Sequence, residues 1–344
     1  MLLISRKDAN PGSVTRGTSV LFYNVSTKWV RRIALINVIV NVIIVLTGGA
    51  VRLTDSGMGC ASWPNCTPET FFPTPAMGIH SAIEWSNRLF GGVVTVVALA
   101  AFIAALLRRP RRKSLVWLTF SVGLGVIVQA LIGAVTVGTV LSPYMVSVHF
   151  LVSMAVLAVA YAAWVRAGEP DGEARALAAP AVVWLWRSIA AVTLVTLTAG
   201  TVVTGAGPRA GDANAPRLAI DEAAAAQAHA DLACLLIGLS VGLVFAAFAA
   251  KVGPRTRRAA IVLVVVEAAQ GLIGLVQYLT DLPVALVAAH MLGAALLWLA
   301  VLAVGTSLRH RLPRPLEAAT VIEVTPTADD EEDDAEEPVA ASAT

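Results

Sequence analysis

Two apolar stretches of the chain reach a histidine at the same offset from a glutamine and a Leu-Ile-Gly run. The two sets lie 141 positions apart. They are Gln129, Leu131, Ile132, Gly133 and His149, and Gln270, Leu272, Ile273, Gly274 and His290. Self-similarity at a fixed period indicates a duplicated structural unit. Because the repeat retains an imidazole, we expect each half of the chain to carry a ligand site.

Three histidines, His149, His229 and His290, each lie a few residues inside an apolar segment. For one isolated histidine, a hydrogen bond between helices is the better explanation. An ionisable group in a membrane helix nevertheless indicates function, and a pair at one depth on parallel helices, as expected for His229 and His290, is typical of axial ligation of heme iron. Zinc fits less well, because it takes three or four ligands and the second half offers no further candidate at that depth.

The segments that carry these histidines are expected to be membrane helices. Of the 344 residues, 57% are hydrophobic and 14% are charged, which is too apolar for an ordinary soluble domain. A hydrocarbon core about 30 Å thick requires about 20 apolar residues per helix. This criterion predicts an all-α membrane protein with eight transmembrane helices, near 33–51, 82–107, 115–140, 145–165, 182–204, 224–250, 259–280 and 284–308.

Basic residues gather in the N-terminal arm, in the second and sixth connections and at the C-terminal exit. Such ends are predicted to be cytoplasmic, so both termini lie inside. The residues are Lys28, Arg31, Arg32, Arg108, Arg109, Arg111, Arg112, Lys113, Lys251, Arg255, Arg257, Arg258, Arg309, Arg311 and Arg314. Residues 1–28 are polar, which predicts a disordered cytoplasmic arm without a cleavable signal peptide. Residues 309–344 carry the acidic run Asp329–Asp334 and are expected to form a disordered, solvated cytoplasmic tail.

The first half differs from the second at one predicted ligand position. Asn87 stands near the place that His229 occupies in the repeat, and asparagine is a poor iron ligand. His80 lies seven residues earlier on the same helix face, where it could reach a differently placed ligand or simply lie in an interface. Glu84 and Arg88 are spaced i, i+4, which fits an intrahelical ion pair. The alternative is that both face a bound molecule, where the carboxylate moves protons and the guanidinium pairs with an acid.

An outward loop between the first two predicted helices contains Cys60 and Cys66. The outer compartment permits disulfides, and the proximity of the two cysteines favours a bridge over two free thiols; a pair that cycles between thiol and disulfide would fit equally well. Cys234, alone in the sixth segment, is expected to be buried packing. Arg52, at the outer end of the first helix, could reach lipid headgroups or pair with an anionic ligand.

Three motifs together resemble the heme A synthase family. They are the Gly-Gly-x-Val-Arg-x-Thr-x-Ser-Gly-x-Gly-Cys-x-x-Trp-Pro-x-Cys run from Gly48 to Cys66, the Ile-Glu-Trp-Ser-Asn-Arg run from Ile83 to Arg88, and the duplicated Gln-x-Leu-Ile-Gly to His units. The resemblance covers residues 30–308 and leaves out both tails. It implies two tandem four-helix bundles, 29–166 with the cysteine loop and 182–308.

The resemblance implies that the protein oxidises the C8 methyl of heme O to a formyl group, giving heme A for cytochrome oxidase. It assigns a heme b cofactor to His229 and His290 in the second bundle, and the substrate to His149 with Glu84 in the first. It also implies a Cys60–Cys66 disulfide. The candidate substrate-binding residues are His149, His80, Asn87, Arg88 and Arg52, with Glu84 and His149 as the catalytic pair.

Family members often carry a histidine where this chain has Asn87. His149 alone would leave one iron position open, which suits oxidative chemistry, whereas two histidines suit electron transfer. The implied partners are membrane lipid, heme O synthase, cytochrome oxidase assembly factors and an electron acceptor, with no nucleic acid. The location is the cell membrane. The alternatives are a diheme b-type cytochrome between quinol and an acceptor, which Asn87 argues against, and a transporter, which gives no account of three histidines at one depth.

Overall fold

The computed structural model describes residues 25–312, and most of them lie in long helices. The helices are α1 (Thr27–Leu53), the short 3₁₀ helix η1 (Pro75–Met77), α2 (Gly78–Leu107), α3 (Lys113–Gly138), α4 (Pro143–Gly168), α5 (Pro180–Ala206), α6 (Glu222–Ala249), α7 (Pro254–Leu279) and α8 (Val284–Ser307). Strands β1 (Ala174–Ala176) and β2 (Arg309–Arg311) complete the described part.

Each of the eight long helices in residues 25–312 is long and apolar enough to cross a membrane. Their outer faces expose large apolar side chains such as Leu89, Val96 and Phe245, which suits lipid rather than water. The prediction of an eight-helix, all-α, multi-pass membrane protein is therefore confirmed. The predicted bounds differ most at the first helix, which begins at Thr27 instead of 33.

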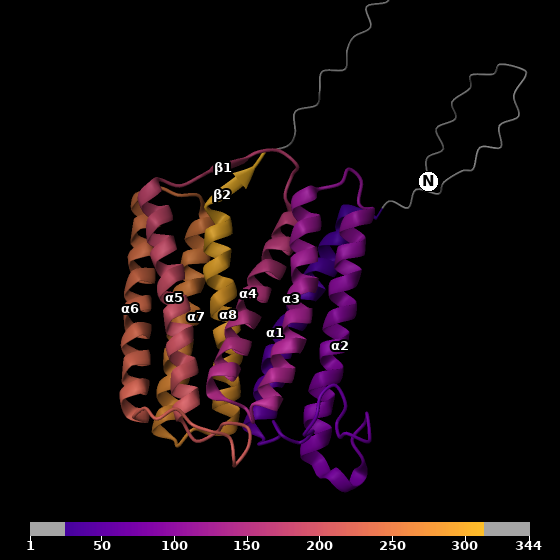
Figure 1. Ribbon diagram of the computed structural model, residues 1–344. Helices are drawn as coiled ribbons and strands as arrows, with labels where there is room; N and C mark the ends of the chain where they lie inside the picture. Colours follow the sequence, from indigo (N-terminus) through magenta and orange to yellow (C-terminus); the bar gives the residue numbers. More distant parts are fainter. Residues whose placement is uncertain (1–24, 313–344) are drawn as a thin grey trace, which may run out of the picture.

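The helices form two neighbouring groups (Figure 1). Helices α1 to α4 contact one another, as do α5 to α8, and the groups meet where α8 packs against α1 and α4 and where α4 packs against α5. Tryptophan hydrogen bonds support this packing, because the Trp298 indole donates to the Met154 carbonyl across the junction at 2.9 Å. The Trp186 indole donates to the Val301 carbonyl within the second group, also at 2.9 Å.

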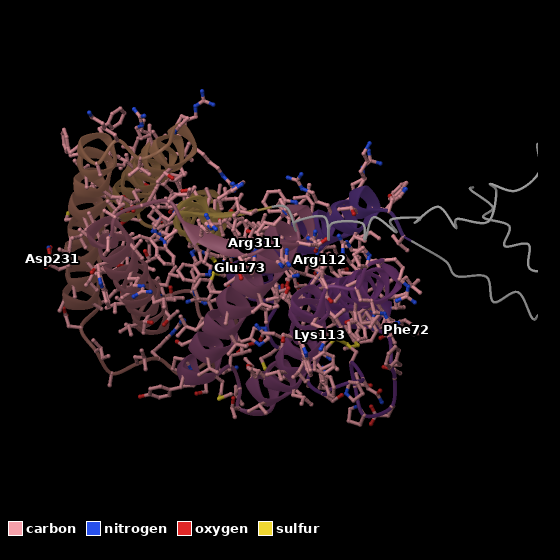
Figure 2. All side chains as sticks on the ribbon, turned by 90° about the horizontal axis from the view of Figure 1, so that it is seen from above. Phe72, Arg112, Lys113, Glu173, Asp231 and Arg311 are labelled. Carbon is pink, nitrogen blue, oxygen red and sulfur yellow. A yellow bond between two sulfur atoms is a disulfide. The ribbon has the colours of Figure 1, made fainter. Side chains whose placement is uncertain are left out.

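Strands β1 and β2 form an antiparallel pair at one end of the molecule, which we call the strand end (Figure 1). Arg311 pairs with Glu169 at 2.8 Å, and Arg112 pairs with Asp171, so the α4–α5 connection is tied to both groups. Figure 2 shows Arg112 and Arg311 near the middle of this end. The expectation that disorder begins at residue 309 was wrong, because residues 309–311 pair with β1; most of both predicted tails lies outside the described residues.

Candidate functional site

The imidazole rings of His229 on α6 and His290 on α8 face each other in the second helix group. Their centroids are 6.3 Å apart and the planes cross at 77°. The Nδ1 atom of His229 lies 3.0 Å from the Thr196 carbonyl, to which it donates, so Nε2 is unprotonated and free to coordinate a metal. The Nδ1 atom of His290 is buried and has no hydrogen-bond partner. The structure therefore brings together the two histidines that the sequence paired.

The glycine of each Leu-Ile-Gly run lies opposite the histidine of its own repeat. A Cβ on Gly274 would lie 3.3 Å from Cε1 of His290, and a Cβ on Gly133 would lie 3.6 Å from Cε1 of His149. The glutamine of the first repeat also has a clear role, because Gln129 Nε2 donates to the His149 carbonyl at 3.0 Å. The repeated motif thus positions a histidine-bearing helix against the helix before it.

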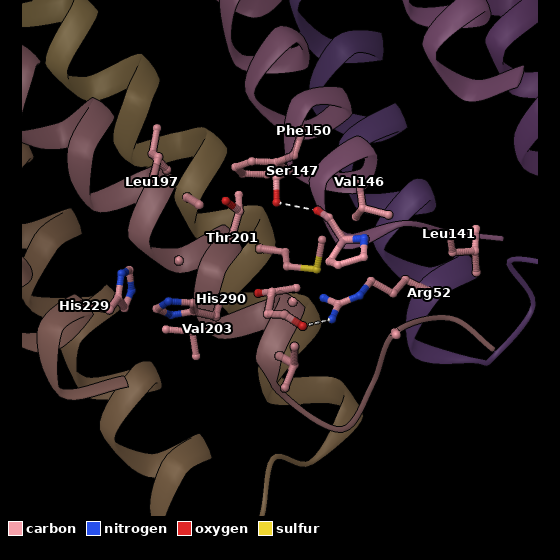
Figure 3. A pocket seen from close by; sticks show the side chains of 18 of the residues that line it. Arg52, Leu141, Val146, Ser147, Phe150, Leu197, Thr201, Val203, His229 and His290 are labelled. Atoms are coloured by element: carbon pink, nitrogen blue, oxygen red, sulfur yellow. Dashed lines mark hydrogen bonds between the residues drawn. The ribbon is translucent and has the colours of Figure 1, made fainter. Parts of the chain in front are cut away.

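A cavity opens beside His229 and His290 (Figure 3). Its wall is mainly apolar and includes helices of both groups, since α4 contributes Phe150 and α1 contributes Arg52. Its other lining residues are Leu141, Pro143, Val146, Ser147, Leu197, Gly200, Thr201, Val203, Thr204, Gly205, Ala210, Pro216, Gln277, Val287, Met291 and Ala294. Arg52 therefore lies at the second-half cavity, although the sequence placed it with the substrate of the first half.

These residues fit a heme. Metal–imidazole bonds are about 2 Å long, so two rings whose centroids are 6.3 Å apart leave room for one metal ion between their nitrogens. The apolar wall suits a macrocycle. No group of three or more histidine, cysteine or acidic side chains in residues 25–312 could hold a metal ion by itself, which fits a porphyrin-bound iron better than a bare ion.

The first helix group offers a different set of polar groups. The Nδ1 atom of His149 is buried without a partner, as in His290. Asn87 accepts a hydrogen bond of 2.8 Å from Thr47 and lines a small groove between α1 and α2. Within the described part of the chain, no hydrogen bond or ion pair joins His149 to Asn87 or Glu84. The predicted substrate residues are thus present, but the structure does not connect them into one cluster.

Glu84 and Arg88 hold the cysteine loop against α2. They form an ion pair with a shortest distance of 2.5 Å, and Glu84 Oε2 accepts from the backbone N–H of Cys60 at 2.6 Å. The Arg88 guanidinium donates to the carbonyls of Ser62, Asn65 and Cys60 at 2.7, 3.1 and 3.1 Å. The predicted intrahelical ion pair is therefore present, and it anchors a loop that has no regular structure of its own.

The Cys60–Cys66 disulfide is present, as predicted, and both cysteines are buried. His80 lies beside the loop rather than beside another histidine, since its Nδ1 is 3.0 Å from Ser56 Oγ. Cys234 is exposed on α6, so the expectation that it is buried was wrong. In a membrane helix an outward position next to lipid is as acceptable for an apolar thiol as a core position.

Sequence reasoning missed two further contributions to the site. The Thr196 carbonyl orients His229, and the first helix supplies a lining residue to the cavity of the second half. The need for an acceptor such as the Thr196 carbonyl could have been predicted, because a metal-bound imidazole usually donates its second N–H to an acceptor. The second depends on how the two helix groups pack together, which no local pattern encodes.

Comparison with known proteins agrees with this geometry. Heme A synthase of Bacillus licheniformis is 32% identical over 128 residues, which are 37% of this chain and 41% of that protein. Heme A synthase of Bacillus pumilus is 31% identical over 126 residues, 36% of this chain and 40% of that protein. A protoheme IX farnesyltransferase of Thermus thermophilus is 28% identical over 303 residues, 80% of this chain and 48% of that protein.

The chain spans less than half the length of each of these relatives in the matched regions. The broader match is to a family. The COX15-CtaA family, described as cytochrome oxidase assembly protein, matches residues 31–302, a range that runs from α1 to α8 and contains both facing histidines and the disulfide loop. The chain therefore belongs to the cytochrome oxidase assembly protein family.

Proposed function

We propose that the protein is a heme A synthase, which oxidises the C8 methyl of heme O to a formyl group. The observation that carries this proposal is the pair of facing imidazoles, His229 and His290, beside an apolar cavity in a chain of the cytochrome oxidase assembly protein family. Two relatives that bear the name heme A synthase support it. Asn87, bonded to Thr47, gives no support to a bis-histidine electron carrier.

In this proposal, His229 and His290 of the second helix group would hold heme b. When bound, such a heme supplies electron transfer, the chemistry that bis-histidine iron suits. The protein's own residues orient the ligands: the Thr196 carbonyl fixes the tautomer of His229, and Gly274 leaves space for the ring of His290. The apolar wall excludes water from the site.

The first helix group receives heme O as substrate, with His149 as its ligand. Glu84 is the candidate group for moving protons, Arg88 positions Glu84, and Asn87 leaves the second iron position open. His80 completes the substrate side near the disulfide loop. The two groups arose by internal duplication, which the repeated glutamine, glycine and histidine positions support.

The protein lies in the cell membrane with its strand end in the cytoplasm. Basic residues at that end, such as Arg112, Arg257 and Arg311, support this orientation, and the disulfide loop then faces an oxidising compartment. Both termini are cytoplasmic. The partners are lipid, an electron acceptor, cytochrome oxidase assembly factors and the enzyme that makes heme O, the class to which the Thermus thermophilus relative's name points.

The test of the heme site is the absorption spectrum of purified full-length variants. Because each ring would supply one axial ligand, His229→Ala and His290→Ala should each remove the low-spin b-type signal. His310→Ala is the matched control, since His310 lies on strand β2, exposed at the opposite end of α8. Low-spin spectra that persist in both variants would contradict the assignment.

A further inference from the structure

Arg52 is a cation from the first helix group that lines the cavity of the second. It lies in the last turn of α1, whereas His229 and His290 belong to α6 and α8. Figure 3 shows its guanidinium directed into the space beside His290, from the side of Leu141. The proposed function uses the two histidines and the apolar wall but gives the half-buried Arg52 guanidinium no role.

Contacts between the two groups fix Arg52 in this position. Helix α1 passes close to α8 at Gly49, where a Cβ would lie 2.7 Å from the end of the Met291 side chain. The guanidinium donates to the Thr204 carbonyl of α5 at 2.5 Å. Just beyond α1, the Gly57 N–H donates to the Gly211 carbonyl of the α5–α6 loop at 2.9 Å. The half-buried side chain is therefore held in place by the second group.

No carboxylate in residues 25–312 forms an ion pair with Arg52. The charged group that acts on it electrostatically is a second cation, Arg217, on the α5–α6 loop. A guanidinium has five donors in a planar fork that matches a carboxylate, and within residues 25–312 the one hydrogen-bond acceptor of Arg52 is the Thr204 carbonyl. A half-buried cation that lines an apolar cavity and has spare donors is suited to bind an anionic group there.

We propose that Arg52 binds a propionate carboxylate of the heme held in the second-half cavity. This inference rests on the proposed function, because it needs a heme between His229 and His290. Heme carries its carboxylates on one edge, so the pairing would direct that edge toward the disulfide end of the molecule. The heme site is then built by both helix groups, and binding in the second depends on a residue of the first.

A guanidinium could also bind the phosphate of a phospholipid, and the following experiment distinguishes this ligand from a heme propionate. The full-length protein in detergent is titrated with ferric protoheme and with protoheme dimethyl ester, whose carboxylates are blocked, and binding is followed by absorbance. Since hydrogen bonds to charged groups are strong, the wild-type protein should bind protoheme at least about tenfold more tightly than the ester. Arg52→Gln should lose this preference, and Arg52→Lys should keep part of it.

Arg187→Gln is the matched control, because Arg187 lies over the Trp184 ring on α5 and does not line the cavity. It should keep the full preference for protoheme. Equal affinity of the wild-type protein for the two pigments, or an unchanged preference in Arg52→Gln as expected for a lipid-binding arginine, would overturn the proposal. The low-spin spectrum tests the heme site itself. Failure of the wild-type protein to bind either pigment, with no low-spin signal, would contradict the proposed function, whereas a low-spin signal with equal affinities would contradict only the role of Arg52.

Discussion

Asn87 is the residue that most separates the first helix group from the second. It bonds to Thr47 near the position where the second group has His229, so an iron bound to His149 would lack a second protein ligand there. We predict that Asn87→His adds a second low-spin heme signal to the spectrum of protein loaded with heme O. His80→Ala should leave that spectrum unchanged, because His80 contacts Ser56 of the loop. An unchanged spectrum in Asn87→His, with lost ligation in His80→Ala, would make His80 the ligand.

Glu84 needs a variant that separates chemistry from loop anchoring. Glu84→Gln keeps an oxygen acceptor for the Cys60 N–H but removes the charge. If Glu84 moves protons, the rate of heme A formation should fall at least about a hundredfold, the usual scale for a general acid or base, while the second-group heme signal stays intact. His149→Ala should behave in the same way. Loss of the second-group heme in either variant would instead indicate a structural role.

Helix positions could be predicted from the apolar runs, but helix ends could not. The apolar run marks the part of α1 that is expected to lie in lipid. The helix itself extends beyond this run, through Arg32 and Arg31, and begins at Thr27, because the start of a helix is set by backbone hydrogen bonds and not by hydropathy. The pairing of His229 with His290 could be predicted from their equal depth in two parallel helices. Strands β1 and β2 were missed, because a strand of three residues is too short to show an alternating pattern.

The ion pair of Arg88 with Glu84 was predicted, but the role of Arg88 in anchoring the loop was not. Its partners there are three backbone carbonyls of an irregular loop, which no sequence pattern indicates. Arg88→Lys should destabilise the protein by about 2 kcal/mol, since an ammonium keeps the charge beside Glu84 but cannot replace the planar fork that donates to three loop carbonyls. A lower thermal unfolding temperature measures this loss.

Alkylation of the unreduced wild-type protein, followed by mass spectrometry, tests whether the Cys60–Cys66 disulfide of the loop is formed. Neither Cys60 nor Cys66 should be modified, because both are in the disulfide, whereas Cys234 is free. An unfolding temperature of Arg88→Lys equal to that of the wild-type protein would show that the loop does not depend on the Arg88 guanidinium. Modification of both loop cysteines without reduction would show that the bridge is absent in solution.

At the scale of the whole molecule, the α4–α5 connection ties the two helix groups at the strand end. Burial opposes ionisation of Asp171, but Arg112 and Arg108 outweigh it and hold the pKa of that carboxyl below its ordinary value of 3.8. A lowered folded-state pKa stabilises the protein above the unfolded-state value and stops doing so as the pH falls through the folded-state pKa. Asp171→Asn should therefore lower thermal stability at neutral pH and flatten its fall below about pH 4.

Glu173→Gln provides the comparison, because Glu173 forms no ion pair in the described part of the chain and should leave the stability profile unchanged. A profile of Asp171→Asn that matches the wild-type protein at every pH would show that the Arg112 pair does not link the helix groups.

The proposed oxidation of heme O can be measured by extracting the pigments from a heterologous host that makes heme O and expresses the full-length protein. The account predicts heme A, or its hydroxylated precursor, beside one tightly bound heme b that depends on His229 and His290. Recovery of heme b with unconverted heme O, from protein that carries the intact low-spin signal, would contradict it.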